Sequence, residues 1–327
     1  MNTEARTVGG RIELVHSIGQ GGCATVWLGR HRDTGALVAV KQLAAGTEQA
    51  ERFRREAEIS AQLTHRNLVR VFDYFVETDG SAALVMEHLR GETLENAVER
   101  RGALPVSAAV ACIVAVLRGL EHAHERGVIH RDLKPSNVFL AVEPDGYVVP
   151  KVLDFGVAKN VDERAILLTQ HGHIVGTPAY MSPEQVRGEH VGAASDLFAV
   201  GAMLYELLTG ELAFRAPSAQ AAMMAILQRE IERHPLVPEA LWPVLERALK
   251  KDPAERHASA TALREALEEG VGYTEQDGVA ALQALEPVVA ELPELPPRVP
   301  SSPSFAPPSL SPSATDVSGP VTAGLTV

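Results

Sequence analysis

The stretch that decides the fold is "VIHRDLKPSNVFL", residues 128–140. Its His-Arg-Asp triplet also occurs at residues 31–33, in "HRDTGALVAVK". The earlier copy lies between two runs rich in β-branched residues, and Asp33 followed closely by Gly35 is typical of a tight turn. We therefore expect a β-hairpin there. Asp132 of the later copy remains as the candidate for a catalytic carboxylate.

Two strands are predicted shortly after Asp132. "NVFLAV" and "YVVPKVLDFG" are joined by the turn sequence "EPDG". Symmetrical pairing about this turn puts Asn137 opposite about Val152, with Asp154 at the same end of the hairpin; Pro150 leaves the register open by one or two residues. Converging amide and carboxylate oxygens favour Mg²⁺. Taken singly, each of these side chains is better explained as a backbone cap or a strand end.

The sequence "GQGGCATV" begins with a glycine-rich loop. Gly19, Gly21 and Ala24 fit the pattern G-x-G-x-x-G/A, which also occurs in dinucleotide-binding Rossmann turns. A Rossmann turn opens a helix, whereas two β-like runs follow here. Backbone N–H groups of such a loop can approach a polyphosphate.

A lysine and a glutamate follow the loop. In the predicted hairpin Lys41 lies opposite about Val26, on the same strand face as Ala39. The segment "ERFRREAEISAQL" is predicted to be a helix with Glu56 on its inward-facing apolar stripe. A buried carboxylate needs a cation, and Lys41 is one candidate. An exposed ion pair between Glu56 and Arg52 fits equally well, and a lone strand lysine is more often a surface residue.

Composition excludes several classes of protein. The chain of 327 residues is 46% hydrophobic and 22% charged, with a net charge of −12, so no attraction to nucleic acid is expected. Two cysteines, Cys23 and Cys112, fit a reducing compartment, and we expect a cytoplasmic protein. The start has no signal-peptide core, and the apolar stretch 106–117 is too short to span a bilayer, so no membrane segment is expected.

The chain divides into a folded part and a tail. Strand patterns dominate the first quarter, and helical patterns follow residue 104, which predicts an α+β fold of two lobes with a cleft between them. The folded part covers residues 11–269, with an N-terminal lobe of about 11–87 and a C-terminal lobe of about 90–269. Residues 270–327 are expected to be a disordered, Pro/Ser-rich tail, with a short helix in "GVAALQALEPVVAEL".

The motifs together resemble those of eukaryotic-type (Hanks-type) serine/threonine protein kinases, and in particular bacterial members. The resemblance covers residues 11–268 and includes "GQGGCATV", "VAVK", "HRDLKPSN", "DFG", "GTPAYMSPE", "SDLFAVG" and "DPAERHAS". The family pattern usually has glycine at position 24 and alanine at position 182, where this chain has Ala24 and Ser182. Both replacements are small, so we expect activity to be retained.

The resemblance implies roles for individual residues. Those implied to act in catalysis are Asp132, which accepts or orients the substrate proton, Lys134, Lys41 and Glu56. Those implied to hold Mg²⁺ are Asn137 and Asp154. Those implied to contact ATP are Ile18, Gly19, Gln20, Gly21, Gly22, Cys23, Ala24, Thr25, Val26, Ala39, Lys41, Met86, Glu87, Leu89, Asn137 and Asp154.

Further residues are implied to regulate or support the site. Arg131 would pair with a phosphate in the activation segment, where Thr169 is the preferred autophosphorylation site and Thr177 is either regulatory or structural. Glu184 would pair with Arg256, and Asp196 would begin a buried helix.

The implied function is transfer of the γ-phosphoryl group of ATP to serine and threonine hydroxyls of proteins, with a homodimer possible during autophosphorylation. A pseudokinase scaffold would need a lost Lys, Asp or Asn, and none is missing. A small-molecule phosphotransferase is disfavoured by the complete "GTPAYMSPE" segment.

Overall fold

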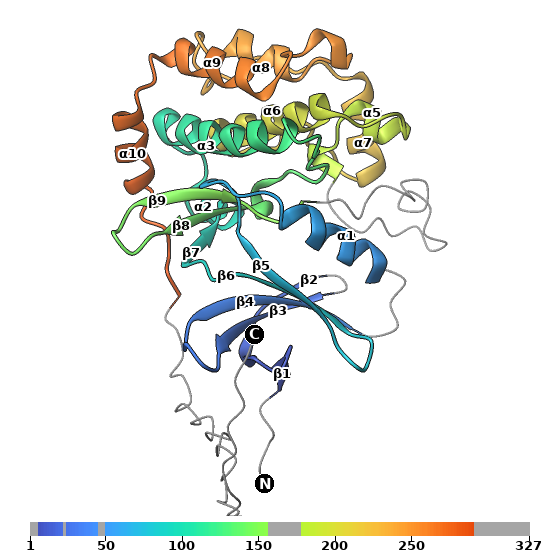
Figure 1. The fold of residues 1–327 in the computed structure, drawn as a ribbon. Helices are drawn as coiled ribbons and strands as arrows, with labels where there is room; N and C mark the ends of the chain where they lie inside the picture. Colours follow the sequence, from blue (N-terminus) through green and yellow to red (C-terminus); the bar gives the residue numbers. More distant parts are fainter. Residues whose placement is uncertain (1–5, 22–23, 45–49, 156–177, 291–327) are drawn as a thin grey trace, which may run out of the picture. The chain divides into compact units, whose positions relative to one another are not determined.

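The computed structural model (Figure 1) describes residues 6–21, 24–44, 50–155 and 178–290. The described residues up to 87 form an antiparallel sheet with one helix, which we call the N-terminal lobe. The residues from 91 to 290 that are described form the C-terminal lobe, which is mainly helical. The fold is therefore α+β, as the sequence predicts.

Six antiparallel strands form the N-terminal sheet in the order β1-β2-β3-β4-β6-β5. They are β1 (Thr7–Val8), β2 (Ile12–Gly21), β3 (Ala24–His31), β4 (Leu37–Leu43), β5 (Val71–Val76) and β6 (Ala82–Glu87). The turn between β3 and β4 contains Gly35 at φ 74°, a left-handed conformation that suits glycine. The first His-Arg-Asp triplet is thus part of a hairpin turn, which confirms the prediction.

Helix α1 (Ala50–Ser60) packs against β5 and β6 of this sheet (Figure 1). Phe53 and Ala57 of α1 form a buried cluster with Leu43, Ala82 and Leu84 of the sheet. This packing turns the opposite side of α1, with the exposed residues Glu51 and Arg54, to solvent. The apolar stripe predicted from the sequence of the helix is therefore the side that is buried.

The C-terminal lobe combines a small sheet with stacked helices. The sheet order is β7 (Gly91–Thr93), β8 (Val138–Val142), β9 (Val148–Val152). The helices are α2 (Leu94–Arg101), α3 (Val106–His124), α5 (Pro183–Arg187), α6 (Ala193–Thr209), α7 (Ala219–Gln228), α8 (Trp242–Ala248), α9 (Ala260–Val271) and α10 (Glu275–Gln283). Helix α6 is buried over most of its length and ends at Gly210 in the left-handed conformation, as predicted.

Helix α3 lies at the centre of the largest hydrophobic core. By length and composition this 19-residue helix could cross a membrane, and it is longer than the apolar stretch predicted from the sequence. However, 72% of its most apolar window is buried by the rest of the protein. It packs against α6, α9 and α10, which identifies it as a core helix.

The folded part extends beyond the predicted boundary at residue 269. Helix α10 packs against α3, and Leu282 and Leu285 belong to the main hydrophobic core. The expectation of disorder from residue 270 therefore does not hold for residues 270–290. The Pro/Ser-rich composition that motivated it begins only near residue 287, whereas the apolar side chains before that point have a core to bury against.

Candidate active site

The strands β2 and β3 form a glycine-rich hairpin. Its facing residues are Gly19–Val26, Gln20–Thr25 and Gly21–Ala24. Gly22 and Cys23, at its tip, lie outside the described residues, whereas Ile18 is described and is 45% exposed. On the next strand, β4, Lys41 lies directly opposite Val26, which confirms the register predicted from the turn.

Lys41 joins two carboxylates from different elements. Its Nζ lies 2.7 Å from Oε1 of Glu56 on α1 and 3.1 Å from Oδ2 of Asp154, which follows β9. Burial opposes protonation of the amine, but Asp154 and Glu56 outweigh it and hold the pKa of Lys41 above its usual value. Of the two partners considered for Glu56, the structure shows an ion pair with Lys41, and the side chain of Arg52 lies outside the described part.

Asp154 is held in position through its backbone neighbours. It adopts φ 30°, an unusual conformation for a residue other than glycine. On one side the N–H of Leu153 donates to the carbonyl oxygen of Asn137 at 2.8 Å. On the other side Phe155 is 2% exposed, and its ring lies 5.0 Å from that of His130. These contacts hold the backbone on both sides of Asp154 and therefore fix the position of its carboxylate.

The segment that contains Asp132 is anchored on helix α6. The carboxylate of Asp196 accepts the backbone N–H groups of His130 at 2.9 Å and Arg131 at 2.8 Å. Arg131 is left-handed, with φ 68°. The Nδ1 of His130 accepts the N–H of Asp132 at 3.3 Å, so its Nε2 carries the proton and donates to the carbonyl oxygen of Leu153 at 2.9 Å. The His130 ring therefore ties the Asp132 segment to the Asp154 segment.

Asn137 and Lys134 complete the group around Asp132. The amide nitrogen of Asn137 donates to the backbone oxygen of Asp132 at 2.7 Å and lies 3.4 Å from its carboxylate. Nζ of Lys134 is 3.4 Å from Oδ2 of Asp132. The β8–β9 register pairs Val138 with Val152, one residue from the predicted pairing and within its stated range. Asn137 is thus brought to the same end of the hairpin as Asp154.

An apolar cluster adjoins these polar groups. Ala39, Val69 and Met86 form it, and the half-buried residues packed against it include Val26 and Leu89. It joins the glycine-rich hairpin to residues 86–90, the segment that connects the two lobes, which we call the hinge. A flat aromatic base could lie on this surface.

The hinge has both free and engaged backbone groups. Neither the N–H nor the C=O of Leu89 has a hydrogen-bond partner among the described residues. The N–H of Glu87 donates to the carbonyl oxygen of Arg70 at 2.9 Å. The side chain of Glu87 lies 3.1 Å from Nζ of Lys151 and accepts the backbone N–H of Arg70 at 2.8 Å.

The polar side chains of the site fit a nucleoside triphosphate with Mg²⁺. Because the amide nitrogen of Asn137 faces Asp132, its carbonyl oxygen is left for a cation. The Asp154 carboxylate is 40% exposed although it contacts Lys41, so one face remains open. The described residues contain no cluster of three or more His, Cys, Asp or Glu side chains suited to a metal. A metal here would therefore need phosphate oxygens and water as its other ligands, as Mg²⁺ does in nucleotide sites.

A buried ion pair supports the lobe below the site. Arg256 binds Glu184 through both guanidinium ends, each at 2.8 Å, and both residues are 2% exposed, which confirms the predicted pair. Ser195 also donates to Glu184, at 2.6 Å. Burial opposes ionisation of Glu184, but Arg256 and Ser195 outweigh it and keep its pKa below the usual value.

Some predicted residues fall outside the description, and sequence reasoning missed others. Thr169 and Thr177 lie outside the described residues. Gln185 was missed: its side chain donates to the carbonyl oxygen of Arg131 at 2.8 Å, and Ser182 and Gln185 form a capping box. The sequence pattern Ser-x-x-Gln could have indicated that box.

The chain is similar to known proteins over most of its length. The family model described as "Protein kinase domain" matches residues 12–267. A probable serine/threonine-protein kinase PknB of Bifidobacterium longum is 39% identical over 225 residues, 65% of this chain and 32% of the relative. Serine/threonine-protein kinase PksC of Streptomyces coelicolor is 40% identical over 243 residues, 71% of this chain and 42% of the relative. The corresponding values for serine/threonine-protein kinase pkn3 of Myxococcus xanthus are 37% over 220 residues, 65% and 40%. The chain thus spans about a third to two fifths of the length of these relatives.

Proposed function

Because the chain belongs to the protein kinase domain family, we propose that it transfers the γ-phosphoryl group of ATP to serine or threonine hydroxyls of proteins. The observation that supports this most directly is the ammonium of Lys41 bridging Glu56 and Asp154, next to the Asp132–Asn137 pair. Three polar segments far apart in the sequence therefore face one site.

Each side chain has a task in this reaction. Lys41 would contact the α- and β-phosphates, and Glu56 holds its ammonium in place. Asp132 would accept or orient the proton of the substrate hydroxyl, a contribution of about 10²–10⁴-fold. Lys134, which lies beside Asp132, would offset negative charge on the transferred group.

Asn137 and Asp154 are the residues that would hold Mg²⁺, which supplies charge neutralisation at the phosphates when bound. The apolar cluster around Ala39 and Met86 would hold the adenine base, and the free backbone groups of Leu89 would hydrogen-bond its edge. Most of the acceleration would then come from positioning and electrostatics.

Autophosphorylation at Thr169 is part of this proposal, with a transient homodimer as the route. Its support is that the hydrogen bonds of Arg131 to other described residues are made by its backbone, so its guanidinium can receive a phosphate. Mass spectrometry of the wild type beside Asp132→Asn tests the idea, since an active enzyme with unmodified Thr169 would refute it. The cytoplasm is the proposed location, since ATP is abundant there and the described cysteine, Cys112, is a free buried thiol.

A radiolabelled-ATP assay on a generic protein substrate tests the main proposal. Lys41→Met should lower label transfer at least 100-fold. Lys250→Met, at a partly exposed lysine paired only with Glu246, serves as the control and should leave transfer unchanged. Equal transfer by wild type and Lys41→Met would contradict the proposal, as would no transfer by the wild type.

A further inference from the structure

The described chain continues beyond the family match. That match ends at residue 267 and α9 ends at Val271, but the structure describes the chain up to residue 290. We call residues 272–290 the C-terminal extension. Gly272 ends α9 in the left-handed conformation, and Thr274 caps α10 by accepting the N–H of Asp277 at 3.2 Å. The extension thus contains a separate helix with its own N-cap residue.

The first attachment of the extension is to α3. Arg118 of α3 donates to both oxygens of Glu275, at 2.9 and 2.7 Å. Its guanidinium also lies 3.5 Å from Glu268 of α9. The start of α10 is therefore fixed by a two-bond ion pair with defined geometry.

The second attachment is apolar. Leu282 and Leu285 are 7% and 1% exposed and belong to the main core of the C-terminal lobe. Arg101, at the end of α2, donates to the carbonyl oxygen of Leu285. The next residue, Glu286, has φ 43°, so the chain turns sharply there.

The third attachment is to the strand that follows the hinge. The backbone N–H of Val288 donates to Oε1 of Glu92 at 3.1 Å. Glu92 is 7% exposed, and its other hydrogen-bonded partner is Arg100. A buried carboxylate cannot replace a lost donor by water, so Glu92 depends on the N–H group that the extension supplies.

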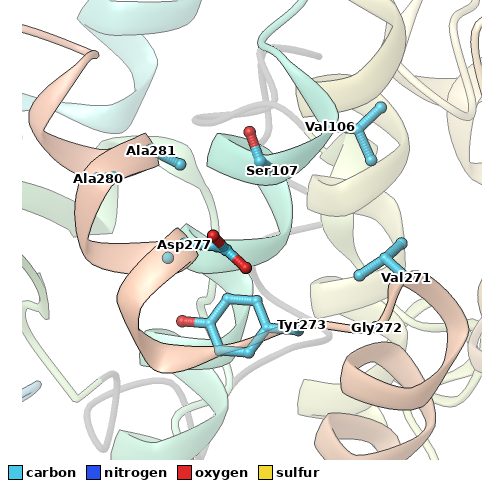
Figure 2. Close-up of a pocket in the computed structure, with 9 residues that line it drawn as sticks. Val106, Ser107, Val271, Gly272, Tyr273, Asp277, Ala280 and Ala281 are labelled. Carbon is cyan, nitrogen blue, oxygen red and sulfur yellow. The ribbon is translucent and has the colours of Figure 1, made fainter.

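A pocket lies between part of α10 and the start of α3. It has a volume of about 560 Å³, and Figure 2 shows Asp277 and Ala281 of α10 on one side and Ser107 of α3 on the other. Tyr273, at the junction of α9 and α10, also lines it. The polar contacts of Glu275 and Val288 lie outside the apolar packing of Leu282 and Leu285, so either polar contact can be removed while that packing remains.

We propose that the C-terminal extension is a brace that holds β7 in position and thereby sets nucleotide affinity at the hinge. Glu92 lies three residues after Leu89, which packs on the apolar cluster proposed to hold adenine. This inference rests on the proposed function only for the identity of the ligand. By linkage, a nucleotide bound at the hinge stabilises the Glu92–Val288 contact to the same extent.

Two substitutions of one exposed residue test the brace in the full chain. Val288→Pro removes the N–H that bonds Glu92, whereas Val288→Ala keeps it. In nucleotide-free protein, hydrogen exchange over residues 88–93 should be at least threefold faster in the proline variant, with α6 unchanged. Equal exchange in the two variants overturns the proposal. If the proline variant fails to fold, Arg101→Leu, which removes the donor to the carbonyl oxygen of Leu285, takes its place.

Binding of Mg²⁺·ADP, measured by calorimetry, tests the link to the hinge. Val288→Pro should bind ADP at least threefold more weakly than Val288→Ala. Glu275→Gln should also weaken binding, whereas its control on α9, Glu265→Gln, should not, since Glu265 is exposed and lies only near Arg264. Unchanged affinity in Val288→Pro and Glu275→Gln overturns the brace. No ADP binding by the wild type overturns the proposed function instead, and hydrogen exchange still decides on the brace.

Discussion

Replacing Arg256 with methionine should destabilise the protein more than any exposed substitution. The change removes both hydrogen bonds to Glu184, at 2.8 Å each, and leaves that carboxylate with Ser195 in a site 2% exposed. It also removes the donors to three backbone oxygens, those of Ala194, Lys250 and Lys251. Methionine keeps an apolar contact near Phe198, so lost packing is not the main effect.

The expected loss follows from the uncompensated charge. Removing one partner of a buried ion pair costs about 3–5 kcal/mol, and we take about 4 kcal/mol here. For a domain of this size that lowers Tm by roughly 10 °C. Arg126→Met is the control, because Arg126 and Glu125 are exposed and their pair is worth no more than about 1 kcal/mol.

Chemical denaturation of the wild type, Arg256→Met, Glu184→Leu and the double variant forms the assay. The double variant should be at least about 2 kcal/mol more stable than Arg256→Met, because no buried charge is left unpaired. The pKa of Glu184 is lowered in the folded state, so the pair stabilises the protein at neutral pH and its contribution fades as pH falls through that pKa. A loss below about 1 kcal/mol for Arg256→Met, or additive effects in the cycle, would refute this reasoning.

Two further predictions concern stability. Nζ of Lys251 has no hydrogen-bond partner among the described residues, and burial lowers its pKa from 10.5 to about 8. Between about pH 8 and 10.5 Lys251 is therefore protonated in the unfolded chain but not in the folded protein, so the free energy of unfolding should rise with pH over this range. Lys251→Met should abolish that rise and add about 1–2 kcal/mol at pH 7 in thermal unfolding; an unchanged pH profile would contradict this. Gly210→Ala should cost about 2 kcal/mol, because φ is 73° and the added carbon would lie 3.1 Å from the backbone nitrogen of Ala103. Gly188→Ala, with φ 67° and open space around it, should cost only about 1 kcal/mol, and equal losses would exclude the contact as the cause.

The local pairings in the site follow from short-range rules. The turn at Asp33–Gly35 determines which residue faces Lys41, because residues at equal distances from the turn of an antiparallel hairpin are paired. The same count about the second hairpin placed Asn137 within one residue of its observed position. Register inside a hairpin can therefore be predicted from the sequence of its turn.

Contacts between distant segments could not be derived in this way. Nothing in the sequence pattern distinguishes Lys41 from Arg52 as the partner of Glu56, because that choice depends on how α1 packs on the sheet. The proton on His130, which ties the Asp132 segment to Leu153, likewise depends on the tertiary fold. The short helix expected within residues 278–292 overlaps α10, so part of the C-terminal extension was predicted. Its packing on α3 and the main core was not, because composition says nothing about tertiary contacts.

The central claim is that the second His-Arg-Asp triplet, and not the first, supports phosphoryl transfer. The most direct measurement is phosphoamino acid analysis after incubation of the chain with radiolabelled ATP, Mg²⁺ and a protein substrate. The wild type and Asp33→Asn should both yield labelled phosphoserine or phosphothreonine, because Asp33 lies in an exposed turn. Asp132→Asn should reduce that label at least 100-fold. Label that persists in Asp132→Asn, or is missing from the wild type, would contradict the account.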